Sequence, residues 1–155
     1  MKVIKVNEKA PDFTLKNESG IEVSLHDFLK NAPVLLAFYP GDFTPVCTMQ
    51  LCEYRDSYKD YLDLGIQLVG ISGDSIESHK KFIDQRKFKF SLLSDPDHKI
   101  AKKFGMKDLF GMSKRGLVLV DTSGIVRSVT VEVVSLFYRK HQKVLDDIKK
   151  VLTKA

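Results

Sequence analysis

The sequence predicts an α/β fold, a three-layer α/β/α sandwich built around a mixed central sheet. Apolar runs of strand length alternate with helical segments, which is typical of a sheet covered by helices on both faces. A hairpin near the end of the chain adds antiparallel strands. The 155 residues are 43% hydrophobic and contain neither an internal repeat nor a Pro-, Gly- or Ser-rich linker. We therefore expect one domain over residues 1–155.

The expected strands are short apolar runs that end at turn-forming residues. Two of them, 33–39 and 66–72, are apolar over most of their length, which indicates buried central strands. Pro40-Gly41 closes the first of these, and Thr122-Ser123-Gly124 forms the turn of the late hairpin. The expected strands cover residues 12–15, 22–24, 33–39, 66–72, 90–93, 116–121 and 125–131.

The expected helices lie between these strands and at the end of the chain. Gly65 and Gly105 follow two of them and are typical signals for a helix C-terminus. The last helix has apolar residues at helical spacing from Val144 to Leu152. The expected helices run from 46 or 47 to 63, from a cap at Asp74 or Ser75 through Ile83, over 100–104 and over 136–152.

The charge balance gives little support to a polyanionic partner. There are 25 Lys and Arg against 20 Asp and Glu, and a net charge of +5 could favour nucleic acid or an anionic surface. The basic residues are spread over expected helices with acids nearby, however, so a solvated, lysine-rich surface explains the excess. No apolar run reaches the roughly 18 residues of a membrane helix. Residues 1–11 lack the apolar segment of a secretory signal, and we expect neither nucleic acid nor membrane as a partner.

The chain has two cysteines, Cys47 and Cys52, which stand five residues apart. Two cysteines in a chain without a visible leader favour catalysis, redox chemistry or metal binding over a structural disulfide framework. The spacing excludes the Cys-x-x-Cys motif of thioredoxin-type redox pairs. A structural zinc site would need two more ligands, and the four histidines are scattered without paired spacing, so each is expected at the surface or half-buried.

Cys47 is expected in the first turn of the helix that follows the buried strand 33–39. Free N–H groups and the positive end of the helix dipole favour a thiolate there, and the thiolate is the nucleophilic form of cysteine. Pro45 suits helix initiation, and Thr44 can cap the helix with its hydroxyl directed to the pocket of the sulfur. The alternative is a buried cysteine that acts as a small hydrophobic residue, with Thr44 as a plain cap.

If Cys47 and Cys52 both lie in one helix, their Cα atoms are about 8–9 Å apart. A disulfide requires roughly 4.4–6.8 Å. The two residues cannot bond while the helix is intact. Either they never bond, with Cys52 serving simple helix packing, or the helix opens locally first.

The residues around Cys47 resemble the active-site pattern of the peroxiredoxin family, Pro40-x-x-x-Thr44-x-x-Cys47. The second cysteine five residues on is similar to the bacterioferritin-comigratory, or Q-type, subgroup, an atypical two-cysteine arrangement. The resemblance extends over nearly the whole chain and implies a thioredoxin-like fold. Further segments that resemble the family in the same order are 10–15, 23–28, 70–74, 92–96 and 121–126.

The resemblance also implies roles for individual residues. Cys47 would be the peroxidatic cysteine, whose thiolate attacks a peroxide and becomes a sulfenic acid. Thr44 would hydrogen-bond the peroxide and the sulfur, and Pro40 would shield the sulfenate. Arg115 stands where the family has an arginine that reaches the thiolate. Cys52 would be the resolving cysteine, which forms a transient disulfide with Cys47 after local unfolding.

The activity implied is a thiol peroxidase for hydrogen peroxide and organic hydroperoxides, in antioxidant defence and cell redox homeostasis. Thioredoxin or a similar dithiol would recycle it, and no metal or organic cofactor is required. We expect a cytoplasmic protein that is a monomer, with a weak dimer as the alternative. One departure is Gln50, where the subgroup usually has Glu; we expect the thiolate to be slightly more favoured as a result. The alternatives are a thiol–disulfide oxidoreductase on the same fold and a non-enzymatic binding or chaperone-like module.

Overall fold

The computed structural model describes residues 2–108, 110–132 and 140–153. Their strands form one seven-stranded sheet in the order β2-β1-β5-β4-β3-β6-β7. The pairs β3–β4 and β4–β5 are parallel and the other pairs are antiparallel, so the sheet is mixed, as predicted. The strands are β1 (Thr14–Lys16), β2 (Glu22–Ser24), β3 (Val34–Phe38), β4 (Gln67–Ser72), β5 (Ser91–Ser94), β6 (Arg115–Val120) and β7 (Val126–Glu132).

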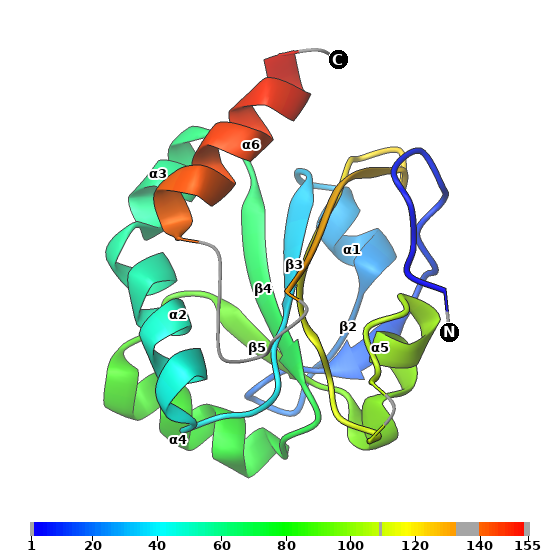
Figure 1. Ribbon diagram of the computed structural model, residues 1–155. Helices are drawn as coiled ribbons and strands as arrows, with labels where there is room; N and C mark the ends of the chain where they lie inside the picture. Colours follow the sequence, from blue (N-terminus) through cyan, green and yellow to red (C-terminus); the bar gives the residue numbers. More distant parts are fainter. Residues whose placement is uncertain (1, 109, 133–139, 154–155) are drawn as a thin grey trace.

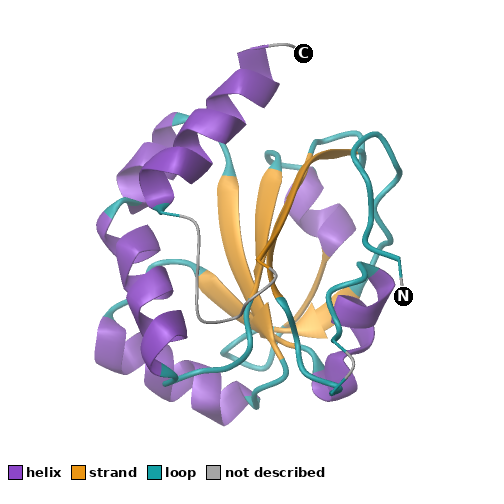
Figure 2. Cartoon of the chain, in the orientation of Figure 1, coloured by secondary structure: helices purple, strands orange, loops and turns teal. Residues whose placement is uncertain are grey.

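Helices cover both faces of the sheet (Figure 1 and Figure 2). Because successive side chains of a strand point to opposite faces, the buried strand β3 supplies two clusters. Leu36 and Phe38 pack in the cluster that includes α1 and α5, whereas Leu35 and Ala37 pack in the one that includes α2, α3, α4 and α6. The three-layer sandwich is confirmed. The helices are α1 (Leu25–Leu29), α2 (Pro45–Asp56), α3 (Tyr58–Asp63), α4 (Ile76–Arg86), α5 (Lys99–Lys103) and α6 (His141–Thr153), with a 3-10 turn η1 (Pro96–His98) before α5.

The first long helix differs from its prediction. It begins at Pro45, one or two residues earlier, and the segment predicted as one helix to residue 63 is divided into α2 and α3. Ser57 separates them with φ −108° and ψ 13°, outside the helical region. No Gly or Pro marks this break in the sequence. Cys47 and Cys52 nevertheless share one helix, α2.

Other boundaries follow the local capping chemistry. Of the two predicted caps of α4, Asp74 and Ser75, it is Ser75 that caps the helix, because its hydroxyl accepts a hydrogen bond of 3.1 Å from the N–H of Ser78. Helix α1 was not predicted; it has five residues, and Ser24 caps it by accepting from the N–H of Asp27 at 3.0 Å. The apolar spacing of the last helix is confirmed, but its predicted residues 136–139 lie outside the described residues.

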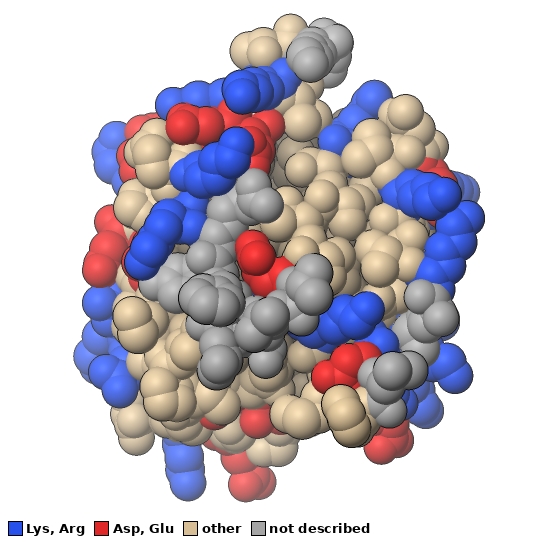
Figure 3. Space-filling model, viewed as in Figure 1, with Lys and Arg blue, Asp and Glu red and all other residues tan. Residues whose placement is uncertain are grey.

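The molecular surface mixes both signs of charge. On the face that Figure 3 shows, Lys and Arg are interspersed with Asp and Glu, as expected for a solvated surface. Among the described residues, no helix is long and apolar enough to cross a membrane.

Candidate active site

The candidate site lies where the carboxyl end of β3 leads through residues 39–44 into α2 (Figure 1). Thr44 is the N-cap residue with φ −71° and ψ 145°, and Pro45 follows in the first turn, where its missing N–H costs nothing. The predicted side-chain cap is wrong: the hydroxyl of the exposed Thr44 makes no capping bond and donates to the carbonyl of Gly41 at 3.0 Å. Pro40 is half-buried in the same loop.

Cys47 is the third residue of α2, and its side chain is fully buried. The guanidinium of Arg115 donates from Nη2 to its Sγ at 3.1 Å. The antiparallel pairing of β3 with β6 explains this approach. Phe38, the last residue of β3, lies opposite Gly116, and Arg115 directly precedes Gly116 in β6, so Arg115 lies level with the start of the loop that follows β3. The structure thus brings together two predicted residues that are 68 positions apart in the sequence.

Arg115 is 2% exposed, so its guanidinium is buried although the residue lies at the start of β6. Its Nη1 donates to Oε1 of Gln50 at 2.5 Å, and Nε2 of Gln50 donates to the hydroxyl of Tyr54 at 3.2 Å. A guanidinium offers donors only, which fixes the orientation of the Gln50 amide. Burial raises the pKa of Tyr54, so its hydroxyl is neutral at ordinary pH. The network holds a permanent cation against the sulfur.

Tyr54 is a residue that sequence reasoning missed. It is 1% exposed, and its ring packs edge-on against Tyr61 at a centroid distance of 5.7 Å. A signal was present, because Cys47, Gln50 and Tyr54 are separated by three and then four residues and therefore share one helix face.

Cys52 is half-buried, and both cysteines are free thiols. The intact α2 keeps their Cα atoms about 8–9 Å apart, beyond the range of a disulfide. The side chain of Arg55 fastens this part of α2 to the end of α4. Its Nη1 donates to the carbonyl of Arg86 at 2.7 Å, and its Nε donates to the carboxylate of Asp56 at 2.9 Å.

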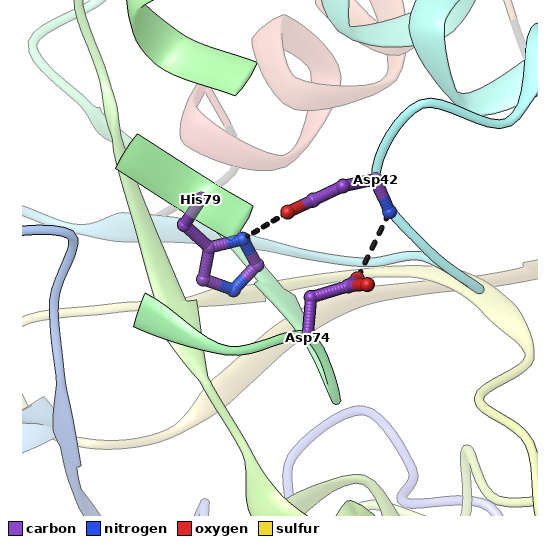
Figure 4. A group of neighbouring side chains, drawn as sticks. All are labelled: Asp42, Asp74 and His79. Atoms are coloured by element: carbon purple, nitrogen blue, oxygen red, sulfur yellow. Dashed lines mark hydrogen bonds and ion pairs between the residues drawn. The ribbon is translucent and has the colours of Figure 1, made fainter. Parts of the chain in front are cut away.

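One histidine contradicts its prediction. His26, His98 and His141 are exposed or half-buried, as expected, but His79 in α4 is fully buried. Its Nδ1 lies 2.7 Å from the buried carboxylate of Asp42, which belongs to the loop before Thr44 (Figure 4). Asp42, Asp74 and His79 place possible ligand atoms within 4.8 Å of one another. Because His79 follows Ile76 and precedes Phe82 by three residues each, helical spacing already placed it on the apolar face.

Comparisons with known proteins identify the family of the chain. The AhpC/TSA family matches residues 6–129. The chain is 48% identical over 121 residues to a chloroplastic peroxiredoxin Q of Sedum lineare, covering 77% of this chain and 64% of that protein. It is 45% identical over 131 residues to a chloroplastic peroxiredoxin Q of Suaeda salsa, covering 82% and 61%. The chain thus spans less than two thirds of the length of these curated relatives.

Solved structures show the same resemblance. The peroxidoxin BcpB of Mycobacterium tuberculosis superposes with a TM-score of 0.86 at 32% identity, over 95% of this chain and 97% of that one. The mitochondrial 2-Cys peroxiredoxin of Plasmodium falciparum gives 0.85 at 30% identity, over 96% and 94%. The expected thioredoxin-like fold is confirmed. The chain belongs to the AhpC/TSA family, and within it to the Q-type, bacterioferritin-comigratory peroxiredoxins.

Proposed function

We propose that this chain is a thiol peroxidase that reduces hydrogen peroxide and organic hydroperoxides with Cys47. One observation carries the proposal: the buried sulfur at the start of α2 receives a hydrogen bond of 3.1 Å from Arg115. The guanidinium and the N-terminus of the helix together stabilise negative charge on the sulfur. A thiolate is the form of cysteine that attacks a peroxide.

In the first step the Cys47 thiolate attacks the terminal oxygen of the peroxide. An S–O bond forms and the O–O bond breaks, so the sulfur is oxidised to a sulfenic acid. The remaining oxygen of the peroxide takes up a proton and leaves as an alcohol or as water. Arg115 stays charged and stabilises the negative charge that develops on the leaving oxygen. Thr44 orients the peroxide through its hydroxyl, and Pro40 shields the sulfenate from water and from further oxidation.

In the second step the thiolate of Cys52 attacks the sulfenic sulfur of Cys47, and the hydroxyl leaves as water after taking up a proton. The Cys47–Cys52 disulfide requires α2 to open locally, because the intact helix separates the cysteines too widely. Thioredoxin or a similar dithiol then reduces the disulfide by thiol exchange. No resident cofactor takes part in either step.

The cycle also suggests a setting. An internal resolving cysteine requires no second subunit, so we propose a monomer with residues 1–155 as a single domain. A transient disulfide suits a reducing compartment, for which we propose the cytoplasm, with a role in antioxidant defence and redox homeostasis. We propose neither nucleic acid nor membrane as a partner, because Lys and Arg are interspersed with Asp and Glu on the face that Figure 3 shows.

A coupled assay with thioredoxin, thioredoxin reductase and NADPH tests the proposal. Hydrogen peroxide should drive NADPH oxidation with the wild type and not with Cys47→Ser. Cys52→Ser should keep the first oxidation of Cys47 and lose thioredoxin-linked turnover, with Cys47 then over-oxidised by further peroxide or held in a mixed disulfide. Unchanged turnover of Cys47→Ser would refute the peroxidase, and unchanged turnover of Cys52→Ser would leave Cys52 a packing residue.

A further inference from the structure

The buried pair of Asp42 and His79 ties the loop of residues 39–44 to α4. Oδ1 of Asp42 accepts from the hydroxyl of Tyr39 at 2.6 Å, and Oδ2 accepts from that of Ser78 at 2.8 Å. Oδ2 also lies 2.7 Å from Nδ1 of His79. Ser78 and His79 belong to α4, and the side chains of Asp42 and His79 are fully buried. We call Asp42, Ser78 and His79 the loop clamp.

Two further contacts hold the same loop. The backbone N–H of Asp42 donates to Oδ2 of Asp74 at 2.9 Å, so the loop is also fixed to the turn after β4 (Figure 4). Phe43 has φ +62°, a left-handed conformation that is unfavourable for residues other than Gly. Its ring packs on that of Phe82 in α4 at a centroid distance of 4.9 Å. The loop is therefore held in a strained conformation from outside.

The hydrogen-bond partners of His79 determine where its protons lie. Nε2 lies 3.1 Å from the carbonyl of Leu93, which only accepts, so Nε2 carries a proton. The hydrogen bond between Nδ1 and Asp42 contains a second proton. With both protons counted, His79 and Asp42 together carry no net charge. Burial raises the pKa of Tyr39 well above its usual value, and Asp42 raises it further, so this hydroxyl remains a donor. Every polar atom of the pair is thus engaged.

The same contacts argue against a metal site here, although the ligand spacing would allow one. A cation bound between Asp42 and His79 would have to displace the proton in the hydrogen bond between Nδ1 of His79 and Oδ2 of Asp42. The hydroxyl of Ser78 would compete for the carboxylate oxygen that faces His79, and the buried hydroxyl of Tyr39 already donates to the other oxygen. The cluster is instead satisfied as a hydrogen-bonded anchor.

We propose that the loop clamp is a positioning device for the two steps of the peroxidase, on whose proposed function this inference rests. The loop it holds carries Pro40 and Thr44 and continues directly into the first turn of α2, which carries Cys47. While the clamp is closed, these residues are placed for attack on the peroxide. The clamp also opposes opening of α2, so it slows formation of the Cys47–Cys52 disulfide and lengthens the life of the sulfenic acid.

Variants at two clamp positions separate this role from general stability. Asp42→Ala removes the anchor. Asp42→Asn keeps it, because the amide can accept from Tyr39 and donate to Ser78 and to a neutral His79. Ser78→Ala removes a single donor at a half-buried helix position and serves if Asp42→Ala does not fold. Ser75→Ala is the matched control, since it removes the cap of the same helix and leaves the clamp contacts in place.

Each reduced full-length variant is mixed with hydrogen peroxide. Peroxide consumption gives the rate of the first step, and thiol blocking followed by mass spectrometry gives the rate of disulfide formation. We expect Asp42→Ala to slow the first step by about tenfold and to accelerate the second. Ser78→Ala should shift both rates in the same directions by less, whereas Asp42→Asn and Ser75→Ala should stay within about twofold of the wild type.

The clamp is refuted if Asp42→Ala and Ser78→Ala change neither rate, if both rates fall together, or if Ser75→Ala reproduces the opposite shifts. Amide hydrogen exchange provides a measurement that does not depend on activity. Exchange over residues 40–52 should rise in Asp42→Ala and Ser78→Ala but not in Ser75→Ala. A wild type that consumes no peroxide would refute the proposed function alone, and unchanged exchange would still refute the clamp.

Discussion

Cys47 and Cys52 lie in the same helix, yet their surroundings are of different kinds. Cys47 is fully buried and receives the guanidinium of Arg115, which Gln50 holds in place. Cys52 is half-buried at the margin of an apolar cluster. The surroundings of Cys47 stabilise negative charge on its sulfur, whereas those of Cys52 are apolar side chains at the edge of a cluster. Under the proposed cycle, the first step would therefore use a preformed site, whereas the second would have to create its site by local unfolding of α2.

Arg115→Ala should have the largest effect on this contrast. Removing a buried charged donor from the reacting sulfur should slow the peroxide step by about 10²–10³-fold, as for the loss of an oxyanion donor. Disulfide formation from a preformed sulfenic acid should change much less, because Arg115 is not needed in the opened helix. Stopped-flow measurement of each step separates the two effects. Equal slowing of both steps would show that Arg115 acts on folding instead, and Arg127→Ala is a control at the surface.

Tyr54→Phe should have a smaller effect on Cys47 and none on the chemistry of Cys52. The variant keeps the ring and its contact with Tyr61 but leaves Nε2 of Gln50 without its acceptor inside the protein. We expect a loss of about 1–2 kcal/mol in the free energy of unfolding. We also expect a several-fold slower peroxide step, since the amide that holds Arg115 becomes less fixed. Urea denaturation and peroxide kinetics measure the two quantities, and an unchanged rate would remove Tyr54 from the positioning network.

Gln50→Glu should shift the ionisation of Cys47 and leave Cys52 unaffected. A carboxylate at this position would add a negative charge beside Arg115 and compete with the thiolate for its guanidinium. We expect thiolate absorbance to develop at higher pH than in the wild type. Measuring the absorbance in a Cys52→Ser background isolates the signal of Cys47. An unchanged or lower midpoint would contradict the expectation.

The elements predicted correctly from the sequence are those with local signals. The apolar run that became β3 and the Ser75 cap were readable from neighbouring residues, and the motif around Cys47 carried the family resemblance. The break at Ser57 had no local signal, because an irregular φ,ψ pair there requires neither Gly nor Pro. Helical spacing placed His79 on the apolar face of α4, but no local signal identifies its partner Asp42, which is 37 residues away in sequence. Only the sheet pairing of the folded chain brings such partners together.

The smallest effect is expected far from either cysteine, at the β6–β7 turn. Burial acts to raise the pKa of Asp121, but hydrogen bonds from the N–H groups of Ile125 and Ser123 and from Arg127 outweigh it, and the pKa is lowered. A carboxyl group with a lowered folded-state pKa stabilises the protein above its unfolded pKa, and this stability is lost as the pH falls through the folded value. Asp121→Asn keeps an oxygen acceptor for the backbone N–H groups of Ser123 and Ile125, and it removes both the charge and the acceptor opposite Arg127.

The variant should therefore lose about 0.5 kcal/mol or less of unfolding free energy at neutral pH, because the pair is partly exposed to solvent. The difference from the wild type should be constant down to about pH 5 and should close below it, as Asp121 of the wild type becomes protonated. Both redox steps should keep their wild-type rates. Denaturation between pH 3 and 7 tests this, and a stability difference that does not narrow as the pH falls would show that the amide disturbs the turn itself. A changed peroxide rate would mean that the site at Cys47 depends on charges well beyond Arg115.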